Sequence, residues 1–136
     1  MYKEIEINTK ANECLINITE DIKRIISEGE INEGICVVYA PHTTAGITIN
    51  SGMDEMTFED IISDIHRLVP TRVDFKHTFD TPSDASGHIK SVLIGNSLSL
   101  IVNKGEPVLG HSQSVLFFEF DGPRKRRTVI RVMGEK

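Results

Sequence analysis

The sequence predicts an α+β fold with a largely antiparallel sheet and about three helices. Short segments rich in β-branched residues outnumber the helical patterns, and the last third of the chain carries strand patterns with no helix between them. Parallel strands need long crossover connections, which are usually helices, so this order excludes a doubly wound α/β fold. At 136 residues the chain can bury a core of its own, and we expect a single domain over residues 1–136.

The N-terminal part of the chain predicts strands around one helix. Tyr2–Thr9 alternates imperfectly between apolar and polar residues, and Leu15–Ile18 gives a second short strand pattern. Thr19 is the predicted cap of a helix whose isoleucines follow the i, i+3, i+4 spacing, and Gly29 ends it. Ile35–Ala40 is then a buried strand, because it is short, continuous in apolar residues and rich in β-branched ones.

The second helix has the clearest pattern in the sequence. Its apolar residues recur from Phe58 to Val69 at i, i+3, i+4, i+7, i+10 and i+11, which predicts one continuous apolar face. Asp54 lies near its start, and Pro70 ends it. The polar stretch Thr71–Ser83 that follows is long for a loop in a compact domain, and such loops are usually functional or mobile.

The C-terminal part predicts one more helix and then strands alone. Ser83 or Asp84 can cap the helix, and Gly95 suits its C-terminal turn. The strand patterns that follow, of which the third is the predicted central strand, are Leu98–Val102, Pro107–Gly110, Val115–Phe120 and Thr128–Val132.

Charge and cysteine content exclude several classes of protein. With 20 acidic and 15 basic side chains, the formal charge of −5 disfavours a nucleic-acid-binding protein, which is usually basic. Cys14 and Cys36 lack metal-ligand spacing, so we expect free thiols in a reducing cytoplasm. The N-terminal residues contain no long apolar run, and we therefore expect neither a secretory signal nor a membrane span.

One stretch, Pro41–Asn50, combines a strand end with polar side chains. Pro41 ends the preceding strand because it has no N–H to donate, and His42, Thr43 and Thr44 follow where the chain leaves the sheet. Strand ends of this kind often carry function. The alternative is a tight connection whose hydroxyls bond the local backbone.

Three of the five histidines, His42, His77 and His88, lie in or beside predicted loops and helix starts. Two imidazoles and a carboxylate, such as Asp54 or Asp84, form a chemically reasonable site for a divalent metal. Histidines scattered along a sequence are also common without any metal, so the pattern alone leaves both interpretations open.

A basic run, Arg124–Arg127, follows a predicted turn at Gly122-Pro123. Guanidinium groups bind phosphate in a bidentate manner, so this run is a candidate site for a phosphorylated small molecule. Two other interpretations are a solvated hairpin tip that protects a sheet edge, and an interface with the carboxylates of another subunit.

Several motifs, taken together and in order, resemble the YjbQ-like family. The segment from His42 to Asn50 is similar to the family's H-T-T-x-[AG]-[IL]-x-I-N motif, and His88–Gly95 is similar to its H-L-K-A-S-L-L-G motif. Leu109–Gln113, Glu119–Arg124 and Arg127 continue the resemblance, which covers essentially the whole chain.

The resemblance implies a small cytoplasmic protein with an α+β sandwich that assembles as a homotrimer. Members of the family are described as secondary thiamine-phosphate synthases, which join a pyrimidine diphosphate to a thiazole phosphate and release pyrophosphate. A divalent metal, Mg²⁺ or Zn²⁺, and a small phosphorylated ligand are therefore expected, with neither nucleic acid nor membrane as a partner. The alternative is a non-catalytic trimeric module that binds a metal or an anion.

The resemblance also implies roles for particular residues. The expected catalytic residues are His42, His88 and Asp54. The expected metal ligands are His42 and His88 from these motifs, joined by His77 from the long loop. The expected substrate-binding residues are Thr43, Thr44, Asn50, Gln113, Arg124 and Arg127. Ser51, Ser86 and Ser112 stand where the family usually has Glu, often a second His, and Trp, so we expect weak activity.

Overall fold

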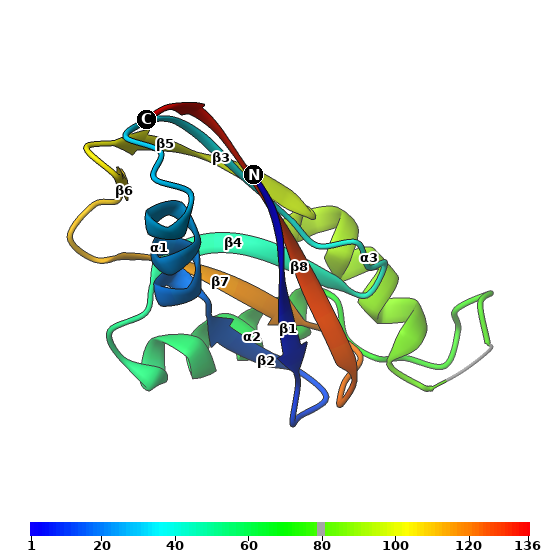
Figure 1. Ribbon diagram of the computed structural model, residues 1–136. Helices are drawn as coiled ribbons and strands as arrows, with labels where there is room; N and C mark the ends of the chain where they lie inside the picture. The colour runs from blue at the N-terminus through cyan, green and yellow to red at the C-terminus, as the bar shows by residue number, and fades with distance from the viewer. Residues whose placement is uncertain (79–80) are drawn as a thin grey trace.

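The computed structural model describes residues 1–78 and 81–136. Within these residues, eight strands and three helices confirm the predicted α+β class (Figure 1). In chain order they are β1 (Tyr2–Asn8), β2 (Cys14–Asn17), α1 (Thr19–Glu28), β3 (Glu33–Tyr39), β4 (Ala45–Ser51), α2 (Glu55–Leu68), α3 (Asp84–Ile94), β5 (Ser97–Asn103), β6 (Glu106–Pro107), β7 (Gln113–Glu119) and β8 (Lys125–Glu135).

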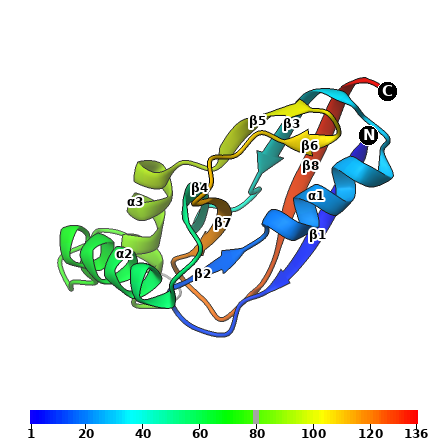
Figure 2. The ribbon, with the colours of Figure 1, turned by 90° about the vertical axis from the view of Figure 1, so that its left-hand side faces the viewer.

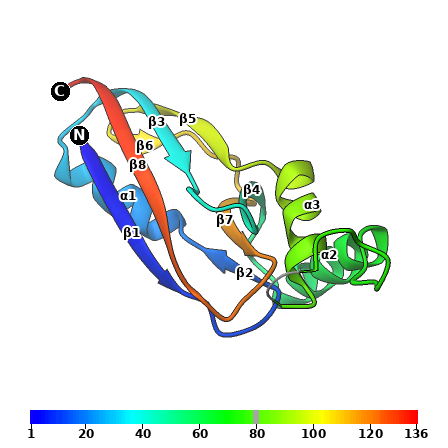
Figure 3. The ribbon, with the colours of Figure 1, turned by 90° about the vertical axis from the view of Figure 1, so that its right-hand side faces the viewer.

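The strands form two sheets, and every strand pair described is antiparallel. A five-stranded sheet has the order β1-β8-β3-β5-β6, and a three-stranded sheet has the order β2-β7-β4. Figures 2 and 3 show α1 on one flank of the molecule and α2 and α3 together at the opposite end. The two helices that flank the long polar stretch are therefore neighbours.

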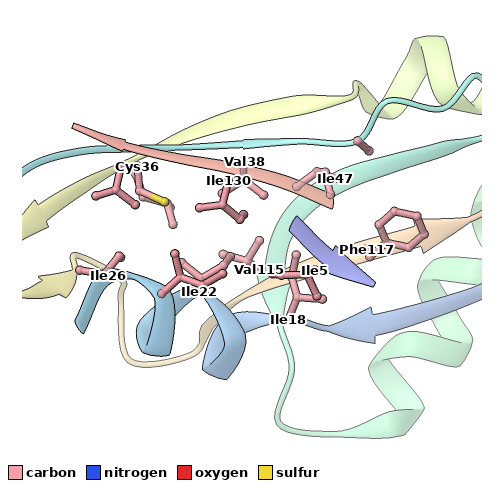
Figure 4. Close-up of a cluster of buried hydrophobic side chains, with 14 of the residues drawn as sticks. Ile5, Ile18, Ile22, Ile26, Cys36, Val38, Ile47, Val115, Phe117 and Ile130 are labelled. Carbon is pink, nitrogen blue, oxygen red and sulfur yellow. The ribbon is translucent and has the colours of Figure 1, made fainter. Parts of the chain in front are cut away.

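The main core lies between the two sheets and α1. Figure 4 shows Ile22 and Ile26 of α1 facing Cys36 and Val38 of β3, with side chains of β7 and β8 around them. Cys36 and Val38 are fully buried while their neighbours along β3 are more exposed, because successive side chains of a strand point to opposite faces.

The predicted central strand, β7, is buried on both faces. Val115 and Phe117 belong to the main core, whereas Leu116 and Phe118 form a second cluster with Leu15 and Phe120. The apolar face predicted for α2 packs against this second cluster, but no residue of α2 itself is fully buried, and Leu68 is 75% exposed.

The structure corrects two local predictions. Thr19 does not cap α1; it is the first helical residue, and the Asn17 side chain accepts hydrogen bonds from its N–H and its hydroxyl. The Thr19 hydroxyl in turn accepts a hydrogen bond from the Val115 N–H. The last strand starts at Lys125 rather than Thr128, so most of the basic run lies within a strand and not in a turn.

Cys14 and Cys36 are both free thiols. Burial raises the pKa of the Cys36 thiol to about 11, so this side chain behaves as a small apolar group. Among the described residues, no helix is long and apolar enough to cross a bilayer.

Candidate metal centre

His77, Asp84 and His88 form a cluster of side chains that could hold a metal ion. One ligand atom from each residue lies within 4.8 Å of the other two. The Nε2 atoms of both histidines approach the same carboxylate oxygen, Asp84 Oδ2, and the His88 distance is 3.2 Å. The two ring centroids are 5.2 Å apart. Of the two carboxylates predicted as alternatives for such a site, Asp54 and Asp84, the structure places Asp84 among these histidines.

Two of the three ligands come from α3. Asp84 and His88 are four residues apart and therefore lie on the same face of the helix. His77 reaches the cluster from the irregular segment that precedes α3. The Asp84 side chain is 7% exposed, while the imidazoles of His77 and His88 are 42% and 40% exposed, so the cluster opens to solvent on the histidine side.

A backbone carbonyl orients the His88 ring. Its Nδ1 lies 3.2 Å from the Thr43 carbonyl oxygen, which can only accept a hydrogen bond. With Nδ1 turned toward this carbonyl, Nε2 is the ring nitrogen that faces Asp84. Metal-ligating histidines are typically fixed in this way, by donating the other ring N–H to a carbonyl or carboxylate.

A buried carboxylate, Asp121, anchors the start of α3. It accepts hydrogen bonds from the hydroxyls of Thr81 and Ser83 and from the Arg124 guanidinium, and the guanidinium distance is 2.8 Å. Burial alone would raise the pKa of Asp121, but these hydrogen bonds outweigh it and leave the pKa below its usual value. Ser83 thus occupies the cap position of α3 as predicted, while its hydroxyl binds Asp121.

The segment after His42 lets α3 approach the sheet closely. A Cβ atom added at Gly46 would lie 2.7 Å from the Gly95 carbonyl oxygen, which leaves no room for a side chain. Ser91 also donates a hydrogen bond of 2.7 Å to the Ala45 carbonyl. Thr44 is buried, and its hydroxyl accepts a hydrogen bond from Arg126. The small and hydroxylated residues of this stretch therefore allow α3 to pack closely against β4.

His42 lies outside this cluster of candidate ligands. Its Nε2 is 3.0 Å from both the backbone N and the backbone O of Arg127, next to the point where β3 and β8 stop pairing. Burial, and then the charge of Arg126, lower the pKa of His42. Its ring borders a separate cavity of about 510 Å³ that also contains Glu4, Glu6 and Arg127. Of the three predicted metal ligands, the structure brings only His77 and His88 together.

The four cations of the basic run each have a carboxylate partner. Within β8, Lys125 and Arg127 are exposed on one face and Arg126 is buried on the other, because successive side chains of a strand point to opposite faces. The pairs are Arg124–Asp121, Lys125–Glu6, Arg126–Glu119 and Arg127–Glu4. Arg126 and Glu119 are both buried, so this pair is structural. A phosphate would have to compete with these carboxylates, and that weakens the interpretation of the run as an anion site.

The remaining predicted site residues lie elsewhere. Asn50 is at the far end of β4 from Thr44, about 20 Å away at the rise of an extended strand. Its side chain accepts a hydrogen bond from the Ser51 N–H, and Gln113, paired opposite Ser51, accepts one from Gly110. Asp54 is exposed and caps α2 by accepting a hydrogen bond from Met56. Their roles in substrate binding and catalysis stay predictions.

Sequence inspection missed a buried polar group behind α3. Lys90 is fully buried and donates a hydrogen bond to Glu13, and its Nζ lies 3.3 Å from His66 Nδ1. The available signal was a lysine within a predicted helix, two residues after His88. Its partners could not be found because Glu13 is 77 residues away in the sequence.

The donor set fits Zn²⁺ better than Mg²⁺. Two imidazoles and one carboxylate, with a further position open to solvent, match the ligands of catalytic zinc sites. Mg²⁺ prefers oxygen ligands in near-octahedral geometry, and the cluster offers only one carboxylate.

A family model and two relatives match nearly the whole length of this chain. A family model described as UPF0047 protein YjbQ-like matches residues 3–135. A UPF0047 protein from Methanocaldococcus jannaschii is 43% identical over 136 residues, covering 100% of this chain and 96% of the relative. The UPF0047 protein YugU of Bacillus subtilis is 35% identical, covering 98% of this chain and 100% of the relative.

Two solved structures show the same fold. A hypothetical protein from Aeropyrum pernix K1 superposes with a TM-score of 0.93 at 30% identity, with 99% of each chain covered. An uncharacterised YjbQ/UPF0047 protein from Clostridium acetobutylicum gives a TM-score of 0.91 at 35% identity, with 96% of this chain and 99% of the other covered.

Proposed function

The chain belongs to the UPF0047 family of YjbQ-like proteins, and on that premise we propose that it binds Zn²⁺ through His77, Asp84 and His88 and thereby holds a small phosphorylated molecule. The convergence of two imidazole Nε2 atoms on the single oxygen Asp84 Oδ2 carries this proposal. A bound divalent ion supplies a concentrated positive charge for phosphate oxygens. The cations of the basic run are paired with carboxylates and supply less of it.

The chain's own residues have three tasks in this function. Asp84, buried at the start of α3, contributes the negative charge that retains a cation. The Thr43 carbonyl, which faces Nδ1, orients the His88 ring so that Nε2 points toward Asp84. Asp121 keeps the first turn of α3 in position through Ser83 and Thr81. The ligand is thus bound on a helix whose position the sheet fixes.

The reaction implied by the family resemblance is thiamine-phosphate formation. The thiazole nitrogen would attack the methylene carbon of the pyrimidine diphosphate, and the carbon–oxygen bond would break with its electron pair leaving on pyrophosphate. We propose that this activity is weak. Ser51 and Ser112 lack the family's carboxylate and indole, and Ser86 is fully buried with its hydroxyl bonded to the Ser83 carbonyl. If the activity is absent, the alternative is a non-catalytic metal- and anion-binding module.

Calorimetric titration separates these functions. Wild-type protein should bind one Zn²⁺ per chain and should bind pyrophosphate only when Zn²⁺ is present. Asp84→Asn should weaken Zn²⁺ binding by a hundredfold or more, whereas the matched control Asp64→Asn, an exposed carboxylate on α2, should not. Unchanged Zn²⁺ binding in Asp84→Asn would refute the metal site. Product formation from the two thiamine precursors would then distinguish the enzyme from the binding module.

We also propose that the protein is a homotrimer in the reducing cytoplasm. The outer face of the larger sheet supports self-association, because Ile35 pairs with Ile101 and Met133 across neighbouring strands and all three are exposed, at 44%, 62% and 53%. Light scattering should give three times the mass of the chain. A monomer whose mass does not change with concentration would refute the trimer.

A further inference from the structure

Helix α3 turns small and polar side chains inward and apolar side chains outward. Its buried residues are Asp84, Ala85, Ser86, Gly87, Lys90 and Ser91. Ile89, Val92 and Leu93 follow the i, i+3, i+4 spacing of one helix face, and they are exposed, at 39%, 83% and 62%. A surface helix normally buries its apolar stripe. We call these three residues the outer stripe, and their exposure indicates a surface that another molecule covers.

The outer stripe borders the open side of the proposed metal site. His88 and Val92 are four residues apart on α3 and therefore lie on the same face of the helix. Ile89 directly follows His88 in the sequence. The imidazole of His88 is also the part of the ligand cluster that is exposed on this helix. A molecule that packs on the outer stripe would therefore lie against the solvent-exposed side of the cluster.

A second exposed apolar surface lies on the larger sheet. Ile35, Ile101 and Met133 are paired across β3, β5 and β8 and point to its outer face, and we call them the sheet patch. Met133 lies near the C-terminal end of β8. Figures 1 and 3 show α3 at the end of the molecule away from the C-terminus. Within one chain the two surfaces are therefore too far apart to cover each other.

The symmetry of a closed ring favours a second copy of the chain as the partner. Three identical subunits form a ring when each contact joins two different surfaces of the chain, because every subunit then offers one surface to each neighbour. The outer stripe and the sheet patch are two different surfaces, and each is apolar at its centre. One copy thus carries the surface that the next copy needs.

Charge complementarity gives this contact an orientation. Arg131 borders the sheet patch, two residues from Met133 on the same face of β8, and among the described residues it lies over the Tyr2 ring and forms no ion pair with a carboxylate. Helix α2, beside α3, contains four acidic residues and one arginine. Glu33 and Glu135 border the patch on its other side. The charges therefore place the α2 of one copy toward the Arg131 of the next.

We propose that the outer stripe of one copy packs against the sheet patch of the next copy, and that the neighbouring copy thereby closes the open side of the metal site. This inference rests on the self-association and the metal site proposed above. It adds the two surfaces that form the contact and the consequence for the site. Each metal site then lies at a boundary between two subunits, and a bound anion is shielded from solvent by the sheet of the neighbour.

Two single variants test the pairing of the surfaces. Val92→Asp places a charge in the outer stripe, and Ile101→Asp places one in the sheet patch, both at exposed positions. Light scattering should show each variant alone as a monomer, whereas the matched control Val73→Asp, an exposed apolar residue outside both surfaces, should keep the wild-type mass. An equimolar mixture of the two variants should form a dimer at high concentration. The intact sheet patch of the first variant can bind the intact outer stripe of the second.

Milder variants keep the test independent of any folding defect. Val92→Ser and Ile101→Thr should each raise the protein concentration at which the assembly dissociates by about tenfold or more. Either aspartate variant at the wild-type mass, or a mixture of the two that stays monomeric, would overturn the contact and leave the trimer itself standing. A monomeric wild-type protein would overturn the contact together with the proposed trimer.

Pyrophosphate binding tests the closure of the metal site separately. Ile101→Asp changes none of the three candidate ligands, yet the loss of its neighbour should weaken binding of pyrophosphate to the Zn²⁺-loaded protein by about fivefold or more. Addition of Val92→Asp should recover part of this loss. Unchanged affinity in monomeric Ile101→Asp would overturn the closure. Failure of the wild-type protein to bind Zn²⁺ would overturn the metal site and its closure, while the masses of the variants would still decide the contact.

Discussion

The central strand β7 and the helix α2 are packed in different ways. In β7, every side chain from Val115 to Glu119 is buried, because one face meets the main core and the other meets the second cluster. In α2, no residue is fully buried, and four side chains that belong to its apolar face are only partly covered. Regions with few buried apolar contacts open more readily, and ligand-binding segments are often drawn from them.

The candidate metal site combines residues of a firmly packed helix with a residue of an irregular segment. Asp84 and His88 sit on α3, which the sheet holds through Ser91 and through the close approach at Gly46. His77 comes from the segment between α2 and α3, which has no regular structure in its described residues. We therefore expect a rigid pair of ligands and a third ligand that adjusts when a metal and a phosphorylated molecule bind.

The largest effect should come from the buried strand. Phe117→Ala removes a fully buried ring from the main core and should lower the free energy of unfolding by about 3–5 kcal/mol. The matched change Phe58→Ala, in the partly covered face of α2, should cost less than half as much. Urea denaturation of both variants measures the difference. Equal losses would mean that α2 is as firmly packed as β7.

The next largest effect should come from the polar contact behind α3. Glu13→Gln removes the negative charge that compensates the buried Lys90 ammonium, and it should lower the free energy of unfolding by about 3 kcal/mol. Asp64→Asn breaks an exposed pair with Arg67 and should change it by less than about 1 kcal/mol. If both variants unfold at the same urea concentration, the buried pair does not hold α2 and α3 together.

Acid should weaken the start of α3 before it affects β7. Because the folded-state pKa of Asp121 is depressed, its contribution to stability is fully present above the unfolded pKa of about 4 and is lost as pH falls through the lower folded value. Asp121→Asn should remove this part of the pH dependence. Urea midpoints recorded across the acid range test it, and identical slopes for variant and wild type would contradict the assigned role.

The smallest effect should come from the cap of α2. Asp54→Ala removes the acceptor of the Met56 N–H and should lower the free energy of unfolding by about 0.5–1 kcal/mol, with no change in Zn²⁺ affinity. This variant also tests the role that sequence resemblance assigns to Asp54. If Asp54→Ala stays folded but loses product formation or Zn²⁺ binding, Asp54 belongs to the active site.

Periodicity and strand composition were enough to predict the helices and the central strand, because those patterns are local. The partners of the site residues were not predictable, because they come from distant parts of the chain. Asp121 meets Ser83 across 38 residues, and His42 meets Arg127 across 85. The sequence therefore predicted one metal site with His42, His77 and His88. In the structure, the His42 ring lies instead against the backbone of Arg127 in β8. The basic run gave no sign that each cation already has a carboxylate partner.

The central claim is that His77, Asp84 and His88 bind one metal ion on a helix fixed by the sheet. The most direct measurement is anomalous diffraction from crystals soaked in Zn²⁺, with data collected above and below the zinc absorption edge. If Zn²⁺ binds as proposed, the map will show one strong peak per chain, at about 2.0–2.2 Å from His77 Nε2, Asp84 Oδ2 and His88 Nε2. A strong peak beside His42, with none among these three side chains, would contradict it.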